Sequence, residues 1–204
     1  MFQADRLAAA LRGLGGGETG GLFGELAAAY SAPERFYHNV RHIAECLARF
    51  DECRPLAESP AEVELAVWFH DAVYDPRRSD NEEMSAAWAE RALRDSGVPP
   101  EPVERVSQMI LATKRHEAED QDTQILLDLD LSILGATAER FEEYDRAIRQ
   151  EYAWVPDAEY RAGRGKILLS FLNRPTIYRT PFVRERCEAR ARENLARKVA
   201  ELGG

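Results

Sequence analysis

The sequence predicts an all-α protein, built as a single helical bundle of about eight to ten helices. Apolar residues recur at helical spacing along the chain of 204 residues. No run shows the alternation of apolar and polar residues that marks a half-buried strand. Residue types common at helix ends accompany the periodicity, with serine or threonine close before proline and glycine after an apolar run.

Three stretches show this periodicity most clearly, because each gathers apolar side chains on one helical face. These faces consist of Leu22, Phe23, Leu26 and Tyr30, of Val103, Val106, Met109 and Ile110, and of Phe141, Tyr144, Ile148 and Tyr152.

Helix boundaries are predicted from capping residues and glycines. Ser31–Pro33 and Thr180–Pro181 resemble helix starts, whereas Gly97 and Gly203 resemble helix stops. The glycine-rich stretch Gly13–Gly21 lacks the Gly-Lys-Ser/Thr sequence of a phosphate-binding loop, and no strand is predicted before it. We therefore expect a flexible connector between two helices there.

One domain is expected over residues 1–204, because its length matches that of an ordinary domain. Within it, residues 1–30 are expected to form N-terminal helices around the glycine-rich connector. Residues 31–135 are expected to form the core of the functional site, and residues 136–204 the C-terminal helices.

Composition argues against several functional classes. The chain has 27 Lys+Arg and 36 Asp+Glu, a net charge of −9, which disfavours binding to nucleic-acid polymers and to anionic membranes. No apolar run reaches the length of a membrane span, and the first residues do not resemble a signal peptide. The three cysteines contain no C-x-x-C pair, and Cys46 and Cys53 lie too far apart on one predicted helix for a disulfide. We expect a cytoplasmic protein.

The first candidate site segment contains two histidines, His38 and His42, four residues apart. On a helix this spacing places both imidazoles on one face. Either both reach one metal ion, or one binds the ion while the other acts on the substrate. A coincidental surface pair is the alternative interpretation.

The second candidate is the pair His70–Asp71, which directly follows three apolar residues near the end of a helix predicted over residues 62–71. A carboxylate buried in such a place needs a partner that offsets its desolvation. A metal ion bound by the neighbouring imidazole and carboxylate is one such partner. A His–Asp hydrogen bond at the helix end is the other.

The third candidate is a pair of aspartates within the apolar stretch 125–135. On a helix, Asp128 and Asp130 point about 200° apart, so at most one faces a given site. Leucines flank Asp130 at helical spacing, which predicts that Asp130 lies on the buried side. Asp128 is then expected to cap, to pair or to face water.

Taken in order, His42, His70–Asp71 and Asp130 resemble the H…HD…D signature of the HD-domain metal-dependent phosphohydrolases, an all-α superfamily. The chain is also similar to a family of small bacterial predicted HD phosphohydrolases, over residues 30 to 200. The shared segments are residues 37–42 (Tyr-His-Asn-x-x-His), 68–75 (Trp-Phe-His-Asp-x-Val-Tyr-Asp), 81–82 (Asn-Glu), 128–135 (Asp-x-Asp-Leu-x-Ile-Leu-Gly), 148–152 (Ile-Arg-x-Glu-Tyr) and 163–164 (Gly-Arg).

The resemblance implies a divalent metal ion, with Mn, Fe, Co, Ni, Zn and Mg as candidates. Its ligands would be His42, His70, Asp71 and Asp130. Residues 37–42 also resemble the metal-site segment of cyclic-nucleotide phosphodiesterases, in which the first histidine donates a proton, and this implies that role for His38. The implied substrate is a small phosphorylated molecule such as a nucleotide, cleaved as a monoester or a diester by metal-activated water.

The chain departs from part of the superfamily at Tyr74, where some nucleotidases carry a glutamate three residues beyond the aspartate of the pair. Asp75 is the nearest candidate for the water-orienting base, followed by Asp80 and Glu82. Asp71 is also a candidate catalytic group, because it can steer the attacking water.

Five further residues are predicted to contact the substrate, in most cases because they can bind phosphate. They are Asn81, Lys114, His116, Arg149 and Arg164. Arginine binds phosphate well in bidentate fashion, but surface salt bridges explain Arg149, Arg161 and Arg164 equally. His116 has a helix-terminal interpretation as well. It is the only histidine between Asp71 and Asp130, which favours one metal ion over two.

Two other functions are left open by the sequence. A few HD-domain relatives are diiron oxygenases, although the histidine count here is low for a diiron pair. A non-catalytic nucleotide-binding regulator is the second alternative, and the presence of all four ligand residues argues against it. The oligomeric state is not predicted.

Overall fold

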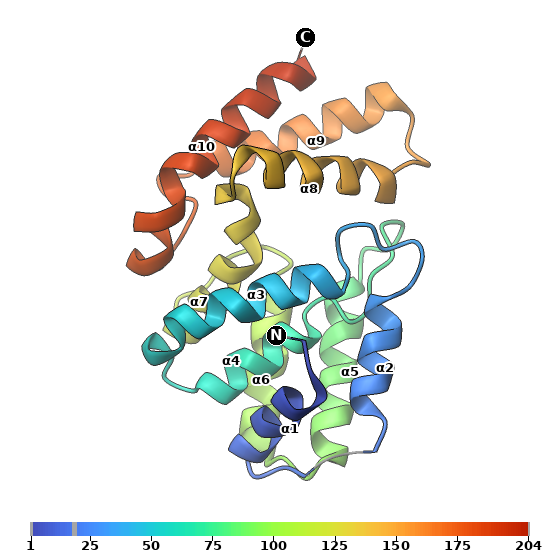
Figure 1. Ribbon diagram of the computed structural model, residues 1–204, viewed down its shortest axis with the longest axis vertical. Helices are drawn as coiled ribbons and strands as arrows, with labels where there is room; N and C mark the ends of the chain where they lie inside the picture. The colour runs from blue at the N-terminus through green and yellow to red at the C-terminus, as the bar shows by residue number, and fades with distance from the viewer. Residues whose placement is uncertain (1, 18–19, 204) are drawn as a thin grey trace. The chain divides into compact units, whose positions relative to one another are not determined.

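The computed structural model describes residues 2–17 and 20–203, and these residues form ten α-helices, two short 3₁₀ helices and no strand (Figure 1). The prediction of an all-α protein is therefore confirmed. The α-helices are α1 (Ala4–Gly13), α2 (Leu22–Tyr30), α3 (Val40–Cys53), α4 (Pro60–Phe69), α5 (Asn81–Asp95), α6 (Pro100–Ala112), α7 (Gln121–Asp130), α8 (Ala138–Glu151), α9 (Asp157–Leu172) and α10 (Pro181–Gly203), and the 3₁₀ helices are η1 (Arg54–Leu56) and η2 (Leu131–Gly135). None of the described helices is long and apolar enough to cross a membrane.

The chain divides into two compact units, Met1–Leu129 and Asp130–Gly204. In the first unit α4 is the central helix, since it packs against α1, α3, α5 and α6. Every residue of α4 from Glu62 to Phe69 is buried, as expected for a helix that is surrounded on all sides. The prediction that residues 1–204 make one domain stays a prediction.

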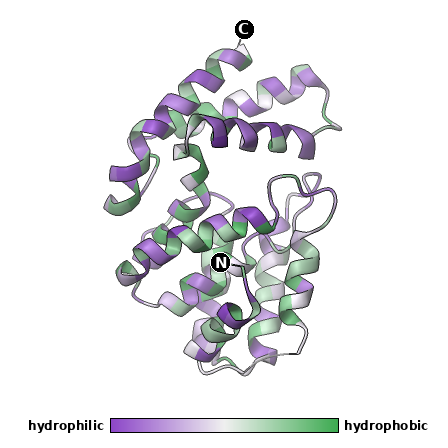
Figure 2. Ribbon diagram, viewed as in Figure 1, coloured by the Kyte–Doolittle hydropathy of each residue, from purple (hydrophilic) through white to green (hydrophobic). Residues whose placement is uncertain are grey.

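The second unit is built around α10, which packs against α9 and η2. Gly135, at the end of η2, allows a close approach to α10, because a Cβ atom there would lie only 2.6 Å from Cys187 Cβ. Most residues of α8 are hydrophilic (Figure 2). The buried residues of α8 include Phe141, Tyr144 and Ile148, three members of the predicted apolar face.

The predicted helix boundaries are partly confirmed. α10 begins at Pro181, and the Val183 amide donates to the Thr180 hydroxyl. Gly97 follows the end of α5 with a φ of 80°, a left-handed conformation that suits glycine. α10 also ends at Gly203.

The predicted helix start at Ser31–Pro33 is wrong. Ser31 is instead the residue that ends α2, and the chain then turns until α3 begins at Val40. The physical reason is a better N-cap further along, since the Asn39 side chain accepts a hydrogen bond from the Arg41 amide at 2.9 Å.

The glycine-rich stretch does connect two helices, because α1 ends at Gly13 and α2 begins at Leu22. Residues 18–19 of this predicted connector lie outside the described residues. The three cysteines are buried and free, and both Cys46 and Cys53 belong to α3, as predicted.

Candidate metal centre

Four predicted ligands come together in space. His42 lies in the first turn of α3, His70 and Asp71 directly follow α4, and Asp130 is the last residue of α7. One nitrogen or oxygen atom from each of the four lies within 4.8 Å of the others. Within the described residues, this is the one group of three or more His, Cys, Asp or Glu side chains arranged to hold a metal ion.

Three of these atoms form a small triangle. His42 Nε2 lies 3.1 Å from His70 Nε2 and 3.3 Å from Asp71 Oδ2, and His70 Nε2 lies 3.1 Å from Asp71 Oδ2. Bonds of about 2.1 Å to a metal ion place neighbouring ligand atoms about 3.0 Å apart in an octahedron and about 3.4 Å apart in a tetrahedron. The triangle therefore has the size that one face of a metal coordination shell requires.

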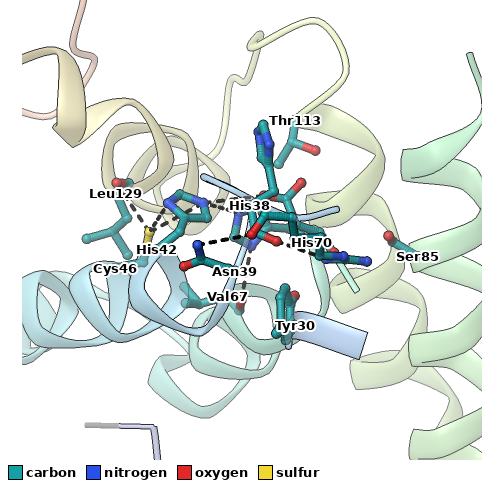
Figure 3. A network of polar contacts seen from close by, with 12 residues as sticks. Tyr30, His38, Asn39, His42, Cys46, Val67, His70, Ser85, Thr113 and Leu129 are labelled. Atoms are coloured by element: carbon teal, nitrogen blue, oxygen red, sulfur yellow. Dashed lines mark hydrogen bonds and ion pairs between the residues drawn. The ribbon is translucent and has the colours of Figure 1, made fainter. Parts of the chain in front are cut away.

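The imidazole of His70 is oriented by the backbone. His70 donates its Nδ1–H to the Val67 carbonyl at 3.0 Å (Figure 3). Because a carbonyl can only accept, this bond leaves the Nε2 lone pair of the neutral ring directed toward His42 and Asp71. Metal-binding histidines are commonly fixed by such a bond from the other ring nitrogen.

His42 is supported by a cysteine. Cys46 Sγ lies 3.7 Å from His42 Nδ1, and the thiol donates to the Leu129 carbonyl at 3.6 Å (Figure 3). Both His42 and Cys46 are 2 % exposed. The cysteine thus connects the α3 ligand to the last turn of α7, the helix that ends in Asp130.

The charge state of Asp71 matches a ligand. Burial by itself would raise the pKa of its carboxyl group. In the protein without a metal ion, positive charge on the His70 and His38 rings lowers that pKa. Hydrogen bonds that the His42 and His70 rings donate when Nε2 carries a proton lower it further, and it ends well below its usual value. Asp71 is therefore a carboxylate at neutral pH, the form that binds a divalent cation.

Two details of the sequence prediction are wrong at this site. The predicted helix over residues 62–71 ends at Phe69, and the His70–Asp71 pair lies in the turn that follows. The expected burial of the two aspartates is reversed, because Asp128 lies inside α7 and is fully buried, whereas Asp130 is only half-buried. Of the three expectations for Asp128, capping and exposure to water are thereby excluded, and pairing stays a prediction. The spacing of the leucines indicated one buried face, whereas in the fold the face of α7 that carries Asp128 is buried as well.

His38 does not share a helix with His42, so the predicted common helical face is also wrong. It precedes the N-cap Asn39, and its ring centroid lies 6.0 Å from that of His42. The ring stacks on Tyr74 at a centroid distance of 3.9 Å. His38 thus lies beside the four-residue group without belonging to it.

Asp75 and Asn81 are joined to each other. The Asp75 amide donates to the Asn81 side-chain oxygen at 3.0 Å, and the Asn81 amide group donates to the Asp75 carbonyl at 2.9 Å. The exposed Asp75 carboxylate accepts from the Arg77 amide at 2.9 Å. These contacts shape the loop after the His–Asp pair, and neither side chain belongs to the metal group.

Lys114 and His116 lie in the turn that follows α6. Lys114 Nζ donates to the Ser79 carbonyl at 2.6 Å and pairs with Glu83, so it ties this turn to the loop before α5. His116 has a φ of 53°, a left-handed conformation. Their predicted contact with substrate stays a prediction.

Arg149 and Arg164 belong to the second unit and make contacts there. Arg149 donates to the Tyr152 and Val155 carbonyls at 2.7 and 3.2 Å, at the end of α8. Arg164 is buried and donates to Asp145 at 3.2 Å. The structure therefore gives both guanidinium groups a local role, and phosphate binding by them stays a prediction. Arg161 likewise donates to a carbonyl of its own unit, that of Glu201, at 2.8 Å.

Two residues near the site were missed by the sequence analysis. Cys46 could have been noticed because it follows His42 by one helical turn. Arg35, which bonds the backbone of Asp71, gives no such signal, because two of its three acceptors are carbonyl groups 36 and 37 residues away in sequence.

Comparison of the chain with protein-family models, with curated proteins and with solved structures gives no match. The candidate metal centre consequently rests on its own geometry, and the family resemblance drawn from the motifs stays a prediction.

Proposed function

We propose that this protein is a metal-dependent phosphohydrolase that cleaves a small phosphorylated molecule, with nucleotides as the first candidates. The convergence of His42, His70, Asp71 and Asp130 carries the proposal. Two imidazoles and two carboxylates form a mixed donor set that suits Mn, Fe, Co, Ni or Zn better than Ca. A group of four ligands supports one ion rather than the pair that a diiron oxygenase needs.

A divalent ion held by these four side chains would polarise a phosphorus–oxygen bond and lower the pKa of water bound beside it. His38 supplies the next requirement, a proton for the departing oxygen. Its ring is held by the stack on Tyr74 and it is not needed as a ligand. Asp71 has a second carboxylate oxygen, which can accept a hydrogen bond from the attacking water and orient it.

The proposal is tested by metal analysis followed by a substrate screen. Protein purified without chelator should carry close to one transition metal ion per chain. It should then hydrolyse at least one member of a panel of nucleoside mono-, di- and triphosphates, cyclic nucleotides and nitrophenyl phosphates. Metal-loaded protein that hydrolyses none of them would contradict the assignment of a phosphohydrolase to this substrate class.

The roles of the two histidines are separated by a pair of variants. His38→Ala should keep its metal and lose roughly 10²–10⁴-fold in turnover, the usual contribution of general acid catalysis. The loss should shrink with nitrophenyl phosphates, whose leaving groups need no proton. His42→Ala should lose metal and activity together. Equal metal loss in both variants, without dependence on the leaving group, would make His38 a ligand instead.

A further inference from the structure

Arg35 lies in the turn between α2 and α3 and is only 9 % exposed. Its guanidinium group donates to three backbone carbonyls. Nη1 donates to His38 at 3.1 Å and to Asp71 at 2.6 Å, and Nη2 donates to Ala72 at 2.8 Å. One side chain therefore joins the segment that carries His38 to the turn that carries Asp71.

The carbonyls of Asp71 and Ala72 lie just beyond the C-terminal end of α4 (Pro60–Phe69). The last carbonyls of a helix lack partners within the helix and carry partial negative charge. A guanidinium group placed there satisfies two acceptors next to that end and is favoured by the helix dipole. The favourable interaction with the end of α4 thus adds to the hydrogen bonds by which Arg35 holds the turn of Asp71 and Ala72.

Aromatic rings hold the guanidinium group in place. Its carbon atom lies 5.2 Å from the ring centre of Tyr30 and 5.9 Å from that of Tyr74, and the Tyr30 hydroxyl donates to the Trp68 carbonyl at 2.9 Å. Tyr74 also stacks on the His38 ring. The backbone of His38 is consequently held by Arg35, and its ring by a residue that Arg35 contacts.

We propose that Arg35 is a positioning residue that fixes His38 relative to Asp71. The inference rests on the proposed function for the role of His38 as proton donor, but the structural part does not depend on it. A planar fork that bonds three carbonyls can be supplied by arginine and not by the point charge of lysine. Arg35→Lys keeps the charge and removes this geometry.

The test compares Arg35→Lys and Arg35→Gln with Arg192→Lys. Arg192 is a matched control, because it also donates to three backbone carbonyls, those of Leu172, Arg174 and Pro175, but lies in the second unit. A cooperative thermal unfolding transition shows that each variant is folded. If Arg35→Lys does not fold, the comparison is made with Arg35→Gln.

Two readouts are measured on each folded variant. Hydrogen exchange should accelerate about tenfold or more at the Asn39 and Ala72 amides in the Arg35 variants alone. Affinity for Co²⁺, followed by its visible absorption spectrum, should fall about 10–100-fold with an altered spectrum, as for other residues that hold metal ligands in place. Arg192→Lys should leave both readouts at wild-type values.

Unchanged exchange at both amides in the folded Arg35 variants would overturn the inference, and so would a Co²⁺ affinity and spectrum equal to those of Arg192→Lys. If the wild-type protein binds no Co²⁺ or other divalent metal, the proposed function fails. Hydrogen exchange then still decides whether Arg35 fixes the two segments.

Discussion

Buried polar side chains gather in both units of the molecule, but with different partners. In the first unit, His42 and His70 place their Nε2 atoms 3.1 Å apart beside the Asp71 carboxylate. In the second unit, Lys198 is 7 % exposed and lies 2.9 Å from Glu142. The first group collects atoms that can donate lone pairs to a cation, whereas the second contains its own cation.

The second cluster is an ion-pair network. Besides Glu142, Lys198 Nζ lies 3.3 Å from Asp145 and 2.7 Å from Glu201, and Arg164 also bonds Asp145. Burial by itself would lower the pKa of Lys198, but hydrogen bonds to Glu201 and Glu142 raise it above its ordinary value. Each charged group in this cluster lies against an opposite charge from the same unit.

A binding group differs from a structural one in what completes it. A network with both signs of charge is complete as folded, so its removal should affect stability alone. A group of two imidazoles and two carboxylates is completed by a cation from solution.

Metal removal should separate the two clusters most strongly. With metal present at 100 to 1,000 times its dissociation constant, binding stabilises the folded state by about 3–4 kcal/mol. Chelation should therefore lower the free energy of unfolding of the wild-type protein by about 3–4 kcal/mol, seen as a lower midpoint in urea denaturation. His70→Ala and Asp130→Ala should contain no metal and show no response to chelator. Full metal content in both variants would contradict the ligand assignment.

Loss of the cation in the second unit should destabilise the protein without affecting the metal. Lys198→Met leaves Glu142, Asp145 and Glu201 with less compensation, and we expect a loss of about 3 kcal/mol in the free energy of unfolding. Urea denaturation measures this loss, and elemental analysis should find the same metal content as in the wild type. A double-mutant cycle with Asp145→Asn then gives the coupling energy of the pair. Loss of the metal from Lys198→Met would contradict the claim that the ion-pair network acts on stability alone.

Cysteines on α3 offer a finer test within the first unit. Cys46 contacts His42 and the Leu129 carbonyl, whereas Cys53 is buried on the same helix without such a contact with a ligand. Cys46→Ala should lower metal affinity by about tenfold, as for other residues that orient a ligand. Cys53→Ala should change stability by about 1 kcal/mol and leave metal affinity unchanged. Titration calorimetry with Mn²⁺ or Co²⁺ compares them, and equal affinities would remove Cys46 from the site.

The smallest expected effect is a pH dependence in the second unit. Burial alone would raise the pKa of Glu142, but hydrogen bonds from Lys198 and Arg197 bring it below its usual value. A carboxyl with a depressed pKa stabilises the folded state above its unfolded pKa of about 4.3, and this contribution disappears as pH falls through the folded pKa. The free energy of unfolding of Glu142→Gln should therefore fall less steeply than that of the wild type below about pH 4.3. The difference between the two proteins should be less than about 1 kcal/mol, because the Glu142 side chain is partly exposed. Urea unfolding of both proteins from acid to neutral pH measures this difference. It should be absent if the bonds of Glu142 to Lys198 and Arg197 contribute nothing to stability.

Part of the site could be predicted from the sequence and part could not. His42, His70, Asp71 and Asp130 could be chosen as candidate ligands because metal-binding residue types stood out in apolar surroundings and in a characteristic order. The position of His38 was predicted less well, because a spacing of four residues says nothing about whether a helix covers both. Here the Asn39 cap starts α3 after His38.

Periodicity, capping residues and glycine act over a few neighbouring residues. The helical class of the fold, the start of the last helix at Pro181 and the turn at Gly97 could therefore be predicted from the sequence alone. The burial of Asp128 inside α7 and the ion pairs of Lys198 with Glu142 and Asp145 depend on how distant segments pack in the folded protein. The same packing places the Arg35 guanidinium group on the carbonyls of Asp71 and Ala72. Such contacts leave no local signal, because they join segments tens of residues apart and a backbone carbonyl is the same acceptor at every position of the chain.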